Sequence, residues 1–203
     1  MTQRVCMDFK KRYMILLLSS IFFSGCGSHE VYRESSIASK PYHAPVLNSN
    51  TKQIYLNAIN KARSQERSCG SAGNFASAAP LKWSDVLYKA SYEHSHDMAR
   101  SKHFSHIGSF GTFDWTANVQ KLGKGSSFKE RIENNGYKKW KNIAENIAMG
   151  SSTIDQVMVQ WLSSDQHCAN IMNPDFTDVG AASVKKEGTH SIYYWTQTFA
   201  AHQ

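Results

Sequence analysis

The sequence predicts an α+β fold in which helices pack on a small sheet. Between residues 51 and 174, apolar residues recur at the three- and four-residue spacing of amphipathic helices. After residue 178 the pattern changes to alternating stretches rich in β-branched and aromatic residues. The turn-forming segment Lys185–Gly188 separates the last two stretches, which therefore predict an antiparallel hairpin.

The N-terminus has the order of a secretory signal. Four basic residues precede an apolar run from Met14 to Phe23, which ends in the small residues Ser24 and Gly25. The run holds about ten apolar residues, whereas roughly 20 are needed to cross a bilayer, so a cleaved signal is favoured over a permanent transmembrane helix. We expect residues 1–25 to be removed as a signal peptide.

Cys26, directly after the small residues, resembles the cysteine of a lipobox, whose thiol is acylated and becomes the new N-terminus. Phe23 departs from the leucine that is usual three positions earlier, and a plain signal peptide with an incidental cysteine is the alternative. The lipobox predicts attachment to a membrane of the cell envelope. Because Gly27 rather than Asp follows the cysteine, sorting to the outer membrane is expected in a Gram-negative host.

Composition limits the partners of the remaining chain. The net charge of +7 falls to +4 when residues 1–25, with four basic residues and Asp8, are removed. The short basic segment Lys138–Lys141 is explained by a solvated loop, so nucleic acid is not expected as a partner. Residues 26–50 are polar, contain Pro41 and Pro45, and predict a lipidated cysteine on a flexible tether. Residues 51–203 then form one domain with its own core.

We expect the four cysteines to have different roles. Cys6 lies in the signal and Cys26 takes the lipid, which leaves Cys69 and Cys168 in an oxidising compartment, where a pair is expected to form a disulfide. The bridge would close a loop of about 100 residues, worth roughly 4.7 kcal/mol in the chain-entropy description. Two unpaired buried thiols are the alternative.

Four helices follow from apolar spacing and capping residues. They are predicted over residues 51–67, from Ser84 to Lys102, from Ser127 to Asn135, and from Thr153 to before Pro174. His94 falls on the apolar face of the second helix and is predicted as a packed or capped residue at the edge of the core.

Strands are predicted over Val179–Val184 and Ile192–Ala200, with a further one in Asn142–Ala148. The interval from Gly108 to Gly125 has weak periodicity and predicts a surface excursion. It contains three large aromatic residues, Phe110, Phe113 and Trp115.

Several motifs in fixed order resemble a known family. They are Phe104-Ser105-His106, Ala144-Glu145-Asn146-Ile147, Trp161 through His167, Asn170 through Pro174, and Tyr194-Trp195-Thr196-Gln197. Together they resemble bacterial members of the CAP superfamily (SCP-like, allergen V5/Tpx-1 related) over residues 51–200. The resemblance implies a three-layer α-β-α sandwich with a small antiparallel sheet. Cys69-Gly70 with His167–Asn170 also resembles a bacterial subgroup in which these two cysteines pair.

The resemblance further implies a cleft lined by His106, Glu145 and His167. The eukaryotic members have a further acid and a different histidine, where this chain has Ser164 and Tyr194. Ala144 also replaces the glycine that usually precedes the glutamate. The full eukaryotic tetrad is therefore absent, and the bacterial trio remains.

Two imidazoles and one carboxylate form a ligand set that Zn²⁺ or another divalent cation uses, with a fourth position open to water. The same trio could instead move protons, with Glu145 orienting an imidazole as general base. The sequence lacks an HExxH helix, since His29-Glu30 has no second histidine, and it lacks a GxSxG nucleophile motif.

Three functions follow from these expectations. The first is a non-enzymatic envelope module that binds a lipid or protein ligand through the His/Glu cleft. The alternative is a metal-dependent hydrolase or peptidase that uses the same cleft. A structural envelope component with a vestigial cleft is the third.

Overall fold

A computed structural model of the chain describes residues 42–186, 188 and 192–203. The predicted signal peptide, Cys26 and the tether up to residue 41 lie outside the described residues, as does Glu187 of the predicted turn. In the described part of the chain, no helix has both the length and the apolar character needed to cross a membrane.

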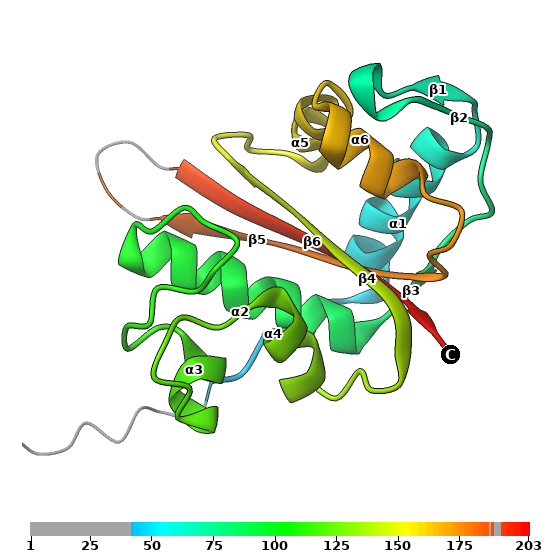
Figure 1. Ribbon diagram of the computed structural model, residues 1–203. Helices are drawn as coiled ribbons and strands as arrows, with labels where there is room; N and C mark the ends of the chain where they lie inside the picture. The colour runs from blue at the N-terminus through cyan, green and yellow to red at the C-terminus, as the bar shows by residue number, and fades with distance from the viewer. Residues whose placement is uncertain (1–41, 187, 189–191) are drawn as a thin grey trace, which may run out of the picture. The chain divides into compact units, whose positions relative to one another are not determined.

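The described domain is a sandwich of three layers (Figure 1). Its central sheet has the strand order β3-β5-β6-β4, formed by Lys82–Trp83, Asp178–Lys186, Ile192–His202 and Trp140–Met149. Helix α2 (Asp85–Ser101), with α3 (Trp115–Gln120) and α4 (Phe128–Asn134), covers one face. Helices α1 (Ser49–Arg63), α5 (Ile154–Leu162) and α6 (Asp165–Met172) cover the other. The predicted three-layer α+β fold is confirmed.

The sheet differs from the expected purely antiparallel one. β5 and β6 form the predicted hairpin and β4 pairs antiparallel with β6, but β3 pairs parallel with β5. Strand β3 has two residues, too few for an alternating pattern to be visible in the sequence.

Helix α1 begins two residues before the predicted start and ends four before the predicted end. Asn48 caps it by accepting from the Thr51 N–H at 2.8 Å, and Ser64 is its C-cap. Arg67 belongs instead to a small hairpin, in which β1 (Arg67–Ser68) pairs with β2 (Asn74–Phe75) around the 3-10 turn η1 (Gly70–Ala72). Arg63 is fully buried and donates to the carbonyls of Ala79, Ile171 and Asn173, which ties the end of α1 to the end of α6.

Helix α2 has the predicted N-cap, since Ser84 accepts from the Leu87 N–H, and it ends near the predicted position, where Lys102 has the left-handed conformation. Its serines bond the sheet directly: Ser91 Oγ donates to Thr198 at 2.8 Å and Ser95 Oγ to Thr196 at 2.9 Å. Gly180 of β5 permits this close approach, because a Cβ there would collide with the backbone nitrogen of Tyr88.

The four remaining helices agree with the predictions to different degrees. The capping box of Ser127 and Glu130 starts α4 as expected. The region expected as one helix from Thr153 to before Pro174 is two helices, because the extended backbone of Ser164 breaks it. Helix α3 was not predicted: it has six residues and lies in the Gly108–Gly125 interval, with Asp114 as its N-cap.

The largest core cluster lies between the sheet and the layer of α1, α5 and α6. Trp161, Ile59, Met172 and Phe199 are its main buried side chains. The predicted disulfide between Cys69 and Cys168 is present and joins the β1–β2 hairpin to α6. Both cysteines are buried, which makes the bridge part of this core.

Candidate functional site

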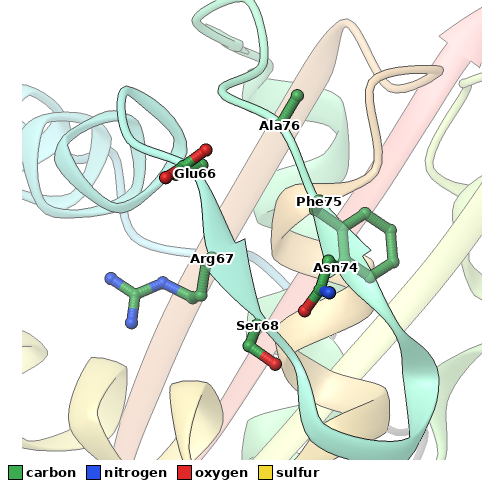
Figure 2. Close-up of a pocket in the computed structure, with 6 residues that line it drawn as sticks. All are labelled: Glu66, Arg67, Ser68, Asn74, Phe75 and Ala76. Atoms are coloured by element: carbon green, nitrogen blue, oxygen red, sulfur yellow. The ribbon is translucent and has the colours of Figure 1, made fainter.

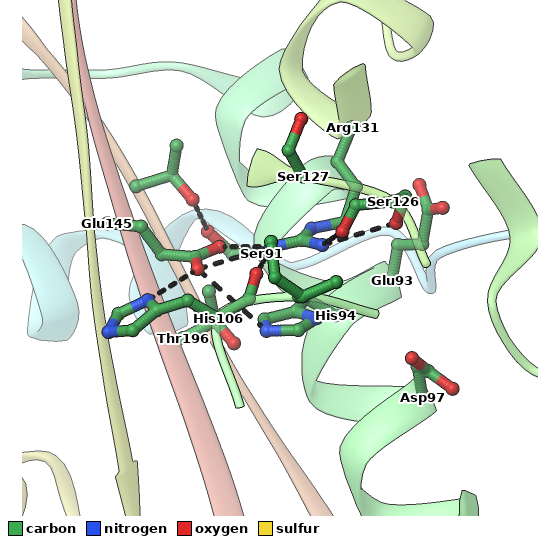
Figure 3. A network of polar contacts seen from close by, with 12 residues as sticks. Ser91, Glu93, His94, Asp97, His106, Ser126, Ser127, Arg131, Glu145 and Thr196 are labelled. Carbon is green, nitrogen blue, oxygen red and sulfur yellow. Dashed lines mark hydrogen bonds and ion pairs between the residues drawn. The ribbon is translucent and has the colours of Figure 1, made fainter. Parts of the chain in front are cut away.

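Glu145 is the centre of a buried polar network (Figure 3). Strand β4 is an edge strand, and Glu145 pairs with Thr198, whose side chain bonds Ser91 of α2. The carboxylate therefore faces the α2 layer. Only 2% of its side chain is exposed, so its charge needs partners within the protein.

Arg131 of α4 is the main partner of this carboxylate. Its Nη2 lies 2.9 Å from Glu145 Oε2 and 3.2 Å from Oε1. The same nitrogen donates to the His106 carbonyl at 2.9 Å, and Nη1 donates to the Ser126 carbonyl at 2.6 Å. The guanidinium thus connects the edge strand to both ends of the excursion that follows α2.

The charged state of Glu145 follows from this pairing. Burial alone would raise the pKa of the carboxyl group, but the adjacent Arg131 guanidinium and the hydrogen bond from His106 hold the pKa of Glu145 far below its usual range. Glu145 is therefore a carboxylate throughout the neutral range and acts as an acceptor only.

His106 is the exposed member of the network. Its Nδ1 lies 3.0 Å from Glu145 Oε1, and 49% of its side chain is exposed. Because the carboxylate can only accept, Nδ1 carries the proton that it donates, and in the neutral ring Nε2 is left as an acceptor. Glu145 therefore fixes both the tautomer and the orientation of the His106 imidazole.

His94 lies beneath His106 and is 1% exposed, in agreement with the prediction of a packed residue. Its Nε2 donates to the Ser105 carbonyl at 2.8 Å and lies 3.8 Å from Glu145 Oε1. Burial, reinforced by the nearby Arg131, lowers the pKa of His94 to about 3. The ring is neutral at physiological pH and holds the segment that carries His106.

His167 lies on α6, on the other side of the edge strand. The side chain of Asn146, next to Glu145, donates to the His167 carbonyl at 3.1 Å and anchors the helix at this point. Burial, together with the neighbouring His106, lowers the pKa of the His167 imidazole. The three residues of the predicted trio therefore lie around one part of β4, with Glu145 buried and the two imidazoles partly exposed.

The positions that depart from the eukaryotic pattern have structural roles. Ser164 is the N-cap residue of α6, and its side chain makes no cap hydrogen bond. Tyr194 is 4% exposed and packs near Phe104, with the ring centroids 6.4 Å apart.

The three residues of the trio differ in how well they could bind a divalent cation. The oxygens of Glu145 already face Arg131 and His106, so in this arrangement the carboxylate orients an imidazole instead of pointing at a metal. His106 and His167 are better suited as ligands, because imidazole nitrogens are common ligands of Zn²⁺. Across the described ranges, no group of three or more His, Cys, Asp or Glu side chains is placed to hold a metal ion.

Two open pockets lie away from this site. One of about 470 Å³ lies at the β1–β2 hairpin, where Arg67 and Phe75 are among its lining residues (Figure 2). Another, of about 490 Å³, lies between residues 42–46, α2 and α3. His106 of the expected cleft is partly exposed beside the edge strand β4.

Arg131 and His94 are the site residues that the sequence analysis did not assign to the site. The excursion between α2 and α4 is also better ordered than its weak periodicity suggested. Asp97 accepts from the Ser109 N–H at 2.7 Å, and Asp114 accepts from the Ser126 N–H at 2.9 Å. Both aspartates are buried, so their bonds to the backbone fix the path of the excursion beside His106.

The fold and the ordered motifs around this site define a family. The profile of the CAP family, described as the cysteine-rich secretory protein family, matches residues 56–199. The chain belongs to this family.

Among curated proteins, the chain is 32% identical over 120 residues to the uncharacterized protein YkwD of Bacillus subtilis, which covers 59% of this chain and 39% of that protein. It is 28% identical over 121 residues to the uncharacterized membrane protein YlbC of the same organism, covering 60% of this chain and 29% of that protein. The matches therefore span less than half the length of either relative.

Two solved structures share the fold. An extracellular protein containing a SCP domain from Bacillus anthracis superposes with a TM-score of 0.54 at 20% identity, over 81% of this chain and 48% of that chain. An outer surface protein from Borrelia burgdorferi superposes with a TM-score of 0.52 at 17% identity, over 79% of this chain and 98% of that chain.

Proposed function

We propose that this protein is a cell-envelope lipoprotein whose CAP domain binds a lipid or protein ligand through the surface around His106, without catalysing a reaction. The observation that carries the proposal is the state of Glu145. Its carboxylate is buried and engaged by Arg131 and His106, which leaves the two partly exposed imidazoles, with His106 oriented by the carboxylate, as groups that a ligand can reach.

The electrostatics of the site speak against Glu145 and His94 as the general acid or base. A general acid or base works best with a pKa near the operating pH. The pKa of Glu145 is held far below that range, and His94 is buried and neutral. The carboxylate therefore has a positioning role, as expected of a group that presents a recognition surface.

The proposal is tested in the envelope of the producing cell with the full chain. A photo-crosslinking residue at position 107, beside His106, should give an adduct with one envelope component, and His106→Ala should abolish it. The same residue at position 159 is the matched control, because Ile107 and Val159 are both exposed apolar positions but lie on different elements. Turnover of a generic ester or peptide that is lost in His106→Ala would contradict a non-enzymatic role.

A second candidate is a metal centre that serves a hydrolase or peptidase, which the hydrogen bond from His106 Nδ1 to a carboxylate favours. Calorimetric titration with Zn²⁺ should then show lost affinity in His106→Ala and His167→Ala. Glu145→Gln should weaken affinity about 10- to 100-fold if the carboxylate only orients the ligand. Equal affinity in all four proteins would remove this candidate, and with it the support for a metallohydrolase.

A further inference from the structure

The exposed apolar residues of the domain are concentrated in one segment. Among the described residues, nine large apolar side chains are exposed, and five of them lie between residues 104 and 119. These five, Phe104, Ile107, Phe110, Phe113 and Val119, are between 41% and 59% exposed. All exposed phenylalanines of the described chain are in this set. We call these five residues, together with Lys102, Lys121 and Lys124, the excursion surface. Such a concentration within 16 residues of one excursion favours an interaction site, because contiguous exposed apolar patches mark such sites.

The charge of the same segment has one sign. Lys102, Lys121 and Lys124 are exposed, and Lys124 also pairs with Glu130 at 3.3 Å while its side chain stays 65% exposed. The only acid between residues 102 and 124 is Asp114, which is buried and bonded to Ser126. Exposed phenylalanines among lysines, without exposed acids, are complementary to an apolar layer beneath anionic head groups.

The excursion surface is held in place by the fold. Ser109 is bonded to buried Asp97, and buried Asp114 accepts from the Phe110 N–H at 3.2 Å. Phe110 has a φ of 57°, a conformation that is uncommon for a bulky residue and that these two carboxylates maintain. The outward position of its ring is therefore built into the loop.

The chain also enters the domain beside this surface. His96 of α2 has Tyr42 on one side and Phe113 on another, each with its ring centroid 5.9 Å away. Tyr42 also packs against Trp115 at 6.2 Å. Tyr42 follows the predicted lipidated Cys26 by 16 positions, which an extended chain spans in at most about 55 Å. A tether of this length allows the excursion surface to reach the bilayer and does not by itself select which face does so.

We propose that the excursion surface contacts the surface of an anionic bilayer and that this contact presents His106, which lies between Phe104 and Ile107, to ligands at the membrane interface. The inference rests on the proposed membrane attachment and specifies the orientation of the domain. It also limits the possible ligands of the His106 surface to molecules that have a group at the lipid–water boundary.

The test uses the full-length protein purified from its host membrane and reconstituted into vesicles of equal parts phosphatidylglycerol and phosphatidylcholine. Phe110→Cys carries an environment-sensitive fluorophore, and Val159→Cys, a comparably exposed apolar position on α5, is the matched control. We expect brominated lipid to quench the label at position 110 and not the one at 159. Lys121→Glu should lower the equilibrium constant for contact with the bilayer about fivefold or more, since one basic residue near an anionic surface contributes about that factor.

Three outcomes would overturn the inference. The first is equal quenching at positions 110 and 159. The second is quenching at 110 that is the same in vesicles of pure phosphatidylcholine, which would remove the role of anionic lipid. The third is that, in detergent, the label at position 110 becomes shielded from solvent as the protein concentration rises. That result would make the surface a contact between copies of the chain. Mass spectrometry of Cys26 reports separately whether the anchor exists, so failure of the surface and failure of the anchor are distinguishable.

Discussion

Arg131 holds three parts of the protein together with one buried guanidinium: the edge strand through Glu145, the start of the excursion through the His106 carbonyl, and its end through Ser126. Both members of the ion pair are 2% exposed. A buried pair of this kind contributes little net stability compared with an apolar pair, but each member depends on the other, since a single buried charge has no solvent to stabilise it.

We therefore expect Arg131→Met to lower the free energy of unfolding by about 3–5 kcal/mol. The double variant Arg131→Met with Glu145→Gln should recover part of that loss, because the uncompensated carboxylate is gone. Urea unfolding of the two single variants, the double variant and the wild type measures the coupling. A double variant that is no more stable than Arg131→Met would show that the carboxylate is not the source of the loss.

His94 predicts a pH dependence of stability. The imidazole has a pKa of about 3 in the folded protein and an ordinary value of 6.5 when unfolded, so only the unfolded chain takes up this proton as the pH falls from 6.5 towards 3. The contribution of the neutral His94 to the free energy of unfolding is fully present above pH 6.5 and is lost as the pH falls below that value. Between about pH 7.5 and pH 5.5 the wild type should lose about 1.4 kcal/mol more than His94→Gln.

Chemical denaturation at the two pH values gives this difference directly. Burial raises the pKa of Glu93 and of Asp97, which favours the folded state at lower pH and opposes the effect of His94. Both carboxyl groups are present in the wild type and in His94→Gln, so their contribution cancels in the comparison. Equal pH dependence in the two proteins would mean that His94 is accessible to protons in the folded state.

The residues of the site were predictable to different degrees. His106, Glu145 and His167 stand in motifs, so a resemblance located them from the sequence. Arg131 gave no such signal: it follows a capping box on a short helix, where arginine is ordinarily a solvated residue. Its role depends on α4 packing beside β4, a contact that apolar periodicity does not encode.

At the scale of the elements, the disulfide attaches helix α6 to another part of the fold. Cys168 joins it to the β1–β2 hairpin, and Asp165 in its first turn accepts from the Ser71 N–H at 2.8 Å. The two attachments are adjacent, so the hairpin and the helix that carries His167 behave as one unit.

Either Cys69→Ser or Cys168→Ser should lower the free energy of unfolding by roughly 2–5 kcal/mol and leave one titratable thiol. Thermal unfolding with and without a reducing agent, together with thiol titration, checks the expectation. Ser71→Ala is a suitable control, because it removes one contact of the same hairpin and leaves the bridge intact. Two free thiols in the denatured, unreduced wild type would contradict the pairing.

Elements with long patterns or clear caps were predictable, and short ones were not. The capping residues Ser84 and Ser127 located two helix starts, and alternation located the strands β5 and β6. Strand β3 and helix α3 are too short to show a period. The break at Ser164 was missed because α5 and α6 together keep a nearly continuous apolar spacing, and the change of direction comes from tertiary packing.

At the scale of the whole molecule, the lipid anchor stays a prediction, because Cys26 lies outside the described residues. Changing Cys26 to Ser should abolish lipid labelling and release the protein from membranes, because one acylated cysteine is the only attachment that the sequence predicts there. Fractionation and labelling of producing cells measure both effects. If membrane retention is unchanged in the variant, attachment does not depend on the lipid.

The position of β6 in the sheet has a consequence for how the chain is made. β6 lies between β5 and β4, yet it follows every other strand in sequence. A chain that emerges from the N-terminus has no partner for β4, and only the two-residue strand β3 as a partner for β5, until residues 192–202 arrive, so the four-stranded sheet cannot be completed before the end of synthesis. The two long strands β4 and β5 are therefore joined into one sheet only when the last residues of the domain become available.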